Sequence, residues 1–153
     1  MTSLIERAVE HASDTRAIVA GADVLPRVGP LVAELLPGRA VIVVADETTW
    51  AVAGEATTAA LRAAGVPLVD PFVFAGTPPP YAGYENVERL REHLRALDAV
   101  VVVVGAGTLN DIAKRASSEL DRPYVCVATA PSMDGYAAFG ASIAKDGYKQ
   151  TLS

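Results

Sequence analysis

The stretch VVVVVGAGTLND, Val100–Asp111, decides the fold of this chain. Five consecutive valines without polar alternation predict a strand buried on both faces, because β-branched side chains suit a pleated surface. Gly105–Gly107 lets the backbone turn tightly and approach a ligand, and Thr108 with Asp111 predicts a capping-box start to a helix. The free N–H groups of a helix start favour a phosphate. Taken alone, the pattern fits a phosphate site and a plain tight turn equally.

Composition limits the classes of function. At 153 residues and 51% apolar, the chain fits one domain, residues 1–153, that buries about 70% of its unfolded surface. A net charge of -5 without any basic run argues against a nucleic-acid partner. The sequence has neither a signal segment nor an apolar run of about 18 residues, so no membrane is expected and the cytoplasm is the expected compartment. Cys126, the single cysteine, is expected to be a small core residue rather than a nucleophile.

Apolar runs alternate with amphipathic segments along the chain. The runs predict strands over 16–20, 39–46, 66–74, 100–104 and 124–128. The amphipathic segments predict helices over 3–13, 22–36, 47–64, 87–97 and 109–120. Pro26 and Pro30 are expected to delay or kink the second helix, and Asn86 to cap the fourth. With Asp146-Gly147 predicting a closing hairpin, the pattern indicates an α/β domain with a largely parallel sheet.

Three predicted strands have a candidate binding group at their carboxyl ends: Asp46, Gly105–Thr108 and Thr129–Gly135. In an open parallel sheet, ligands bind beyond the carboxyl ends of the strands. An ordinary Rossmann fingerprint needs GxGxxG and an acid about 20 residues later, whereas this chain has Asn110 in the third place and its acid earlier. The glycines can still approach a pyrophosphate, and the acid can accept from a ribose hydroxyl. Asp134-Gly135 fits an ordinary turn as well as a site.

The motifs GAGTLNDIAK and RPYVCVATAPSMDGYAAFGASIAKDGYK, with VADETTW after the second strand, carry a family resemblance. The chain resembles the glycerol-1-phosphate dehydrogenase family of the iron-containing alcohol dehydrogenase and dehydroquinate synthase superfamily, with most likeness to its bacterial branch associated with arabinose operons. The resemblance implies a Rossmann-like dinucleotide-binding domain. It also implies an oxidoreductase that uses NAD, or NADP, on a polyol phosphate: it interconverts dihydroxyacetone phosphate and glycerol 1-phosphate for phospholipid biosynthesis.

The resemblance also implies roles for individual residues. Gly105, Gly107 and Thr108 would hold the cofactor pyrophosphate, Ala106 and Asp111 would also bind the cofactor, and Asp46 would face the adenosine ribose. Thr129 and Ser132 would border the cofactor, and Asp134 would lie toward the nicotinamide as the catalytic residue. An acid at 46 next to Glu47 favours NAD over NADP, because a 2'-phosphate there meets like charge.

Two departures from the family limit these roles. Ala138 stands where the family usually has a serine, which removes one expected hydrogen bond to the cofactor. Family members are about twice as long, and their second half supplies the ligands of a divalent metal such as Zn, Ni or Fe. His11 and His93 are expected at the surface, so no metal site is expected within the chain and the chain alone is expected to be inactive.

Alternatives to this enzyme remain open from the sequence. One is a dehydrogenase of unphosphorylated glycerol, and another is a stand-alone nucleotide-binding remnant without catalysis. A fragment of a longer enzyme explains the missing half equally well. A homo-oligomer is open too, because the chain is expected to expose an apolar patch if the missing half normally covers one face. Lys145 and Lys149, near the end of the chain, either meet a substrate phosphate or are simply solvated.

Overall fold

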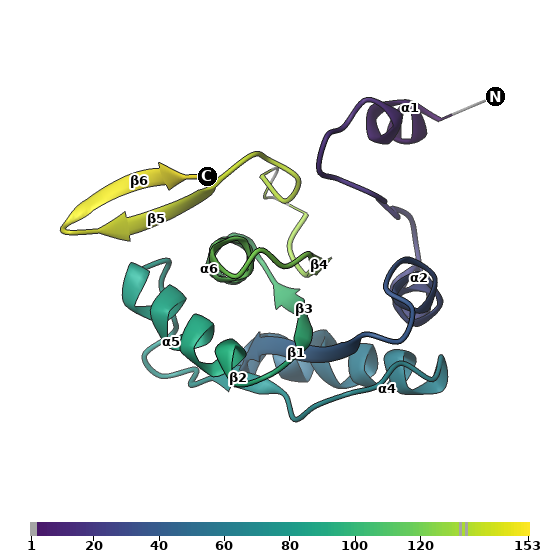
Figure 1. Cartoon of the computed structure of the whole chain (residues 1–153), viewed down its shortest axis with the longest axis horizontal. Coiled ribbons are helices and arrows are strands. Elements are labelled where there is room, and N and C mark those ends of the chain that lie inside the picture. The colour runs from purple at the N-terminus through teal and green to yellow at the C-terminus, as the bar shows by residue number, and fades with distance from the viewer. Residues whose placement is uncertain (1–2, 132, 134) are drawn as a thin grey trace.

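A four-stranded parallel sheet forms the centre of the chain in the computed structural model, which describes residues 3–131, 133 and 135–153 (Figure 1). Its strands are β1 (Ala40–Asp46), β2 (Phe72–Phe74), β3 (Ala99–Gly105) and β4 (Tyr124–Ala128), in the spatial order β2-β1-β3-β4. Strands β5 (Ala141–Lys145) and β6 (Tyr148–Leu152) form an antiparallel hairpin. The predicted α/β fold with a parallel sheet and a closing hairpin is confirmed.

Helices precede and connect the parallel strands. They are α1 (Leu4–Glu10), the 3-10 turn η1 (Leu25–Arg27), α2 (Val28–Leu35), α3 (Glu47–Thr49), the π-helix η2 (Trp50–Gly54), α4 (Glu55–Ala63), α5 (Tyr84–Arg95) and α6 (Gly107–Glu119). Pro26 and Pro30 lie in the first turns of η1 and α2, where their missing N–H groups are not needed, so the second helix starts late as expected.

The two faces of the sheet carry separate apolar cores. Because successive side chains of a strand point to opposite faces, Ile42 and Val44 of β1 pack toward α5 and α6, and Val41 and Val43 pack toward α2 and α4. All seven residues of β3 are buried, as the valine run predicts. Helices therefore cover both faces of a strand that has no solvent side.

Two predicted strands are wrong or too long. Residues 16–20 are extended but pair with no strand among the described residues, because β propensity alone cannot supply a neighbouring sheet edge. The strand predicted over 66–74 shrinks to β2, preceded by a single bridge between Val41 and Leu68. Pro67 and Pro71 lack the N–H groups that a continuous ladder requires.

Two predicted helices also differ in detail. The helix predicted over 47–64 is interrupted by η2, in which the Trp50 ring packs on Gly54; a Cβ on Gly54 would lie 2.7 Å from that ring. The predicted Asn86 cap is wrong. Helix α5 starts at Tyr84 with Gly83 as its N-cap, and the Asn86 amide instead donates to the Tyr81 carbonyl at 2.9 Å.

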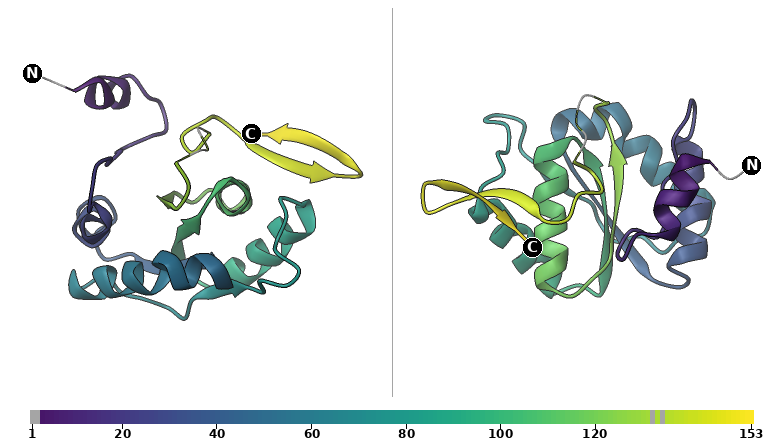
Figure 2. Two further views of the ribbon diagram at one scale, coloured as in Figure 1. Left: turned by 180° about the vertical axis from the view of Figure 1, so that it is seen from behind. Right: turned by 90° about the horizontal axis from the view of Figure 1, so that it is seen from above.

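The hairpin is anchored to the body through β5 and extends outward beyond α6 (Figure 2). Ile143 and Ala141 are buried in the core beneath α6, and the Ala144 N–H donates to the Ala82 carbonyl at 2.7 Å. Asp146 and Gly147 both adopt positive φ, 52° and 80°, as a type I′ hairpin turn requires. In contrast, α1 lies apart from the sheet and has no buried residue (Figure 2).

A polar network centred on Glu119 joins α5 to α6. The Glu119 carboxylate accepts from Arg91, from the Tyr84 hydroxyl at 2.9 Å and from Arg115 Nε at 2.8 Å. Its side chain is only 12% exposed. Burial raises the pKa of Glu119, but these three hydrogen bonds lower it by more, so the pKa lies below its ordinary value.

We expect Glu119→Gln to destabilise the chain by about 2 kcal/mol at pH 7, because it removes charge-assisted hydrogen bonds. The stabilisation from Glu119 is present above the pKa of an unfolded glutamate, about 4.3, and is lost as the pH falls through the lower folded pKa. Urea unfolding of wild type and variant should therefore converge in acid. Glu88→Gln is the control, since Glu88 is 3.9 Å from Arg91 and 53% exposed; an equal loss in both variants would contradict the assignment.

No helix in the described part of the chain combines the length and the apolar character needed to cross a membrane.

Candidate functional site

The sheet reverses its order between β1 and β3. From β1 the chain goes to β2 on one side and then returns to β3 on the other side of β1. The Val44–Val103 register places Asp46, at the end of β1, level with Gly105, at the end of β3. Such a switch point leaves a crevice at the carboxyl ends of the strands, where open α/β sheets bind ligands. The acid precedes the glycine turn in the sequence because it ends β1, and the strand order then places β1 beside β3.

Asp46 has a structural role at this crevice. Its Oδ1 accepts from the Thr49 N–H at 2.7 Å, and the Thr49 hydroxyl lies 3.1 Å from the Asp46 N–H, which forms a capping box for α3. The neighbouring Glu47 carboxylate accepts from the Gly76 N–H at 3.0 Å. Since a carboxylate has two oxygens, Asp46 can cap α3 and still accept a hydrogen bond from a ligand.

Helix α6 begins at the other side of the crevice. Its N-cap is Ala106, which makes no side-chain capping bond. The capping box predicted for Thr108 and Asp111 is wrong, because the helix starts at Gly107 and places Thr108 inside its first turn. The first N–H groups of the helix consequently have no side-chain acceptor of the kind that a cap supplies, and the helix dipole favours an anion there.

The two glycines of the turn have different surroundings. A Cβ on Gly105 would lie 2.6 Å from Cδ1 and 2.8 Å from Cβ of Leu109, so Gly105 allows the helix to pack on the strand. Among the described residues, the flexible Met133 side chain is the nearest group that a Cβ on Gly107 would meet, at 3.3 Å and more. Gly107 therefore lets a group approach the helix start closely, and the turn fits a phosphate or pyrophosphate.

The loop after β4 lies beside this turn. The Thr129 N–H donates to the Gly105 carbonyl at 3.1 Å, which continues the β3–β4 ladder and brings Thr129 to the same edge as Gly105. The other two predicted residues of this loop, Ser132 and Asp134, lie outside the described residues. Their assigned roles stay predictions.

A groove of about 570 Å³ separates the start of α6 from the hairpin. The α6 side contributes Gly107, Thr108 and Asp111, and the hairpin side contributes Ser142 and Lys149. Burial raises the pKa of Asp111, while the Ser142 backbone and the charges of Lys114 and Lys149 oppose that rise. The groove thus begins at the start of α6, beside the crevice, and offers a ligand both an acid, Asp111, and a cation, Lys149.

Lys114 is a residue of this region that the sequence analysis did not single out. Its Nζ donates to three carbonyls of the loop after β4, those of Ala138, Gly140 and Gly135, at 2.8, 3.2 and 3.5 Å. Burial lowers its pKa, and the neighbouring Asp111 raises it. Its position three residues after Asp111 on α6 was the one available signal, because that spacing puts both side chains on one helix face.

Beneath the groove lies a set of buried polar groups. Asn110 is fully buried and its Oδ1 accepts from the Tyr124 hydroxyl at 3.0 Å, so the residue in the third fingerprint position supports the helix from below. Burial raises the pKa of the Cys126 thiol to about 12. The half-buried Cys126 packs against the apolar core, as expected of a packing residue, and a thiol with that pKa is protonated at neutral pH.

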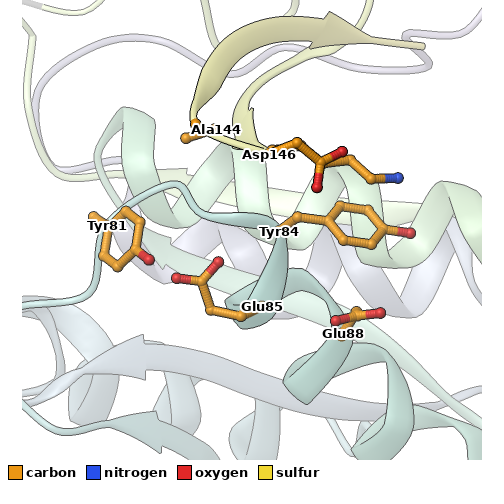
Figure 3. Close-up of a pocket in the computed structure, with 8 residues that line it drawn as sticks. Tyr81, Tyr84, Glu85, Glu88, Ala144 and Asp146 are labelled. Carbon is orange, nitrogen blue, oxygen red and sulfur yellow. The ribbon is translucent and has the colours of Figure 1, made fainter.

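A second groove, of about 670 Å³, lies between the start of α5 and the hairpin turn (Figure 3). Figure 3 shows Tyr84 and Glu85 of α5 facing Asp146 of the turn. Lys145 Nζ lies 4.1 Å from the centre of the Tyr84 ring, which engages Lys145 in a cation–π contact rather than in the first groove. Lys145, one of the two lysines considered for a substrate phosphate, lines this second groove, whereas Asp46, Gly105–Thr108, Asp111 and Thr129 do not.

Among residues 3–131, 133 and 135–153, no three His, Cys, Asp or Glu side chains gather as metal ligands. His11 is exposed, and the exposed His93 ring packs 4.9 Å from the ring of Phe72. The described residues therefore do not fit a metal centre.

The sequence profile of the family described as iron-containing alcohol dehydrogenase matches residues 19–153. The chain belongs to this family. Two relatives are named glycerol-1-phosphate dehydrogenase [NAD(P)+]. The protein of Thermoplasma volcanium is 34% identical over 133 residues, which are 86% of this chain and 36% of the relative. That of Halalkalibacterium halodurans is 32% identical over 113 residues, which are 73% of this chain and 28% of the relative.

The chain spans about a third of the length of the curated relatives it matches. Solved structures share its fold at low identity. Maleylacetate reductase from Agrobacterium tumefaciens matches with a TM-score of 0.71 and 20% identity, over 92% of this chain and 38% of the reductase. Glycerol dehydrogenase from Schizosaccharomyces pombe matches with a TM-score of 0.67 and 18% identity, over 85% and 32% of the two chains.

Proposed function

We propose that this chain is the dinucleotide-binding domain of an NAD(P)-dependent, metal-dependent dehydrogenase that interconverts glycerol 1-phosphate and dihydroxyacetone phosphate. The observation that carries the proposal is the crevice at the switch point, with Asp46 on one side and the side-chain-uncapped start of α6 on the other. The relatives named glycerol-1-phosphate dehydrogenase [NAD(P)+] support the same substrate and cofactor.

In this proposal the first turn of α6 binds the cofactor pyrophosphate through the backbone N–H groups that follow Ala106. Gly107 lets the phosphates approach, and Thr129 borders the bound cofactor. The free oxygen of Asp46 accepts from the adenosine ribose. Bound NAD(P)H supplies the hydride, and the residues of this chain bind and orient it.

The groove between α6 and the hairpin is proposed to take the reacting end of the complex. Asp111 accepts hydroxyl groups of the polyol, and Lys149 on the hairpin attracts the substrate phosphate. Asp134 is proposed to lie toward the nicotinamide, as the family resemblance implies. A metal would need ligands other than the described residues, so none of these roles depends on it.

The test is a calorimetric titration of the 153-residue chain with NADH and, in parallel, with NADPH. We expect tighter binding of NADH, because the 2'-phosphate of NADPH meets the Asp46 carboxylate. Asp46→Asn is the informative variant, since asparagine keeps an oxygen for the Thr49 N–H and so preserves the cap of α3. It should weaken NADH binding by about tenfold, as expected for a lost hydrogen bond to a charged group, and reduce the preference over NADPH.

Asp98→Asn is the matched control, because Asp98 directly precedes β3 at the opposite end of the strands and its side chain is 91% exposed. It should leave the preference between the two nucleotides unchanged. Tighter binding of NADPH than of NADH by the wild type would overturn the role of Asp46, and no binding of either nucleotide would overturn the proposal for this chain.

A further inference from the structure

The loop that closes one end of the α6 groove is gathered onto a single side chain. Lys114 Nζ lies 2.8 Å from the Ala138 carbonyl, 3.2 Å from that of Gly140 and 3.5 Å from that of Gly135. A lysine ammonium has three donor hydrogens, and these three carbonyls come from one six-residue segment, 135–140. One cation therefore fixes both ends and the middle of this segment relative to α6.

The same segment forms part of the groove wall. Gly135, Ala138, Phe139 and Gly140 all line the groove that also contains Gly107, Thr108 and Asp111. Lys114 itself is absent from that lining, because its side chain approaches the segment from α6 and ends at the loop carbonyls. Moving the segment would change the shape of the groove without removing any group that touches a ligand.

The segment has a further side-chain contact through Tyr136, whose hydroxyl donates to the Ala130 carbonyl at 2.9 Å; this bond ties it to the start of the same loop and not to α6. Ala137, Ala138 and Phe139 are exposed, with Phe139 80% exposed, so apolar burial contributes little to its order. The Ala138 N–H to Gly135 carbonyl bond, at 3.2 Å, closes a turn within the segment but does not attach it to α6. The hydrogen bonds from the Lys114 ammonium thus attach the segment to α6.

We infer that Lys114 is a positioning residue, which preorganises the segment 135–140 as a wall of the groove between α6 and the hairpin without contacting the cofactor. The inference rests on the proposed function, because it takes the groove as the place where the reacting end of bound NADH lies. A preorganised wall strengthens binding by lowering the ordering cost that a ligand must otherwise meet.

The test compares Lys114→Met with the wild-type 153-residue chain by hydrogen exchange and by NADH titration. Methionine keeps the length of the side chain and removes all three donors. We expect faster amide exchange in residues 135–140, unchanged exchange in β1 and β3, and NADH affinity lower by about tenfold. Lys145→Met is the matched control: it removes a hairpin lysine that contacts Tyr84 instead, and should change neither readout.

Lys114→Gln gives a second, milder variant whose amide keeps two donors, and it should fall between wild type and Lys114→Met in both readouts. A purely structural role predicts a general rise in exchange, including β1 and β3, and this result would overturn the inference. Faster exchange in the segment with unchanged NADH affinity would also overturn it. Failure of the wild type to bind NADH would refute the proposed function itself, and is recognised because it appears without any substitution.

Discussion

Replacing Gly29 with alanine is expected to destabilise the chain by at least about 3 kcal/mol, although alanine is the better helix former by about 1 kcal/mol. Gly29 lies in α2 where that helix crosses α4. A Cβ at this position would lie 2.2 Å from the Ala60 carbonyl oxygen and 2.9 Å from the Ala64 Cβ. The carbonyl belongs to the helix backbone and cannot rotate away, so the two helices must separate and open the core beneath them.

Urea unfolding of Gly29→Ala measures this loss, and two further variants test its cause. Gly38 lies just after the same helix, and a Cβ there would meet no described atom within 4 Å. Gly38→Ala should therefore lower the free energy of unfolding by only about 1 kcal/mol, through the positive φ at this position. Gly29→Ala combined with Ala64→Gly should recover little stability, because the carbonyl contact remains. A neutral or stabilising Gly29→Ala would show that helix propensity outweighs the contact between the helices.

The strands and helices that the sequence predicted well are those whose pattern is set by burial. β1 and β3 are unbroken apolar runs covered on both faces, and α5 keeps Val87, Leu90 and Leu94 at helical spacing. The segment 16–20 has the same local composition as a strand and was predicted as one. Its failure to pair depends on which sheet edge lies nearby, and a local pattern contains no information on that neighbour.

The candidate site was predictable in its parts and not in its arrangement. Asp46, Gly105 and Thr129 follow strands in the sequence, so their place at carboxyl ends could be predicted. The order β2-β1-β3-β4, which puts Asp46 beside the glycine turn, could not be read from chain order, since it is set by the crossover connections. The contacts of Lys114 were missed because they are made with carbonyls, which every residue has regardless of its side chain.

Gly105 and Gly107, the two glycines of the turn after β3, are expected to respond differently to the same substitution. Gly105→Ala should lower the free energy of unfolding by about 3 kcal/mol, because the new methyl group overlaps the Cβ as well as Cδ1 of the buried Leu109. The Cβ of Leu109 is fixed by the backbone of α6, so relief requires the start of that helix to move away from β3. The loss should therefore appear as global instability in urea unfolding, with or without nucleotide.

Gly107→Ala should change the free energy of unfolding by less than about 1 kcal/mol, since the nearest described group to the new methyl group is the flexible Met133 side chain and alanine favours the helix. Its NADH affinity should nevertheless fall at least about tenfold, because that methyl group stands where the pyrophosphate approaches the first turn of α6. Urea unfolding and NADH titration of both variants separate the two effects, each variant serving as control for the other. If Gly107→Ala binds NADH like the wild type, the first turn of α6 is not the phosphate site, and GAGT serves only to pack a helix on a strand.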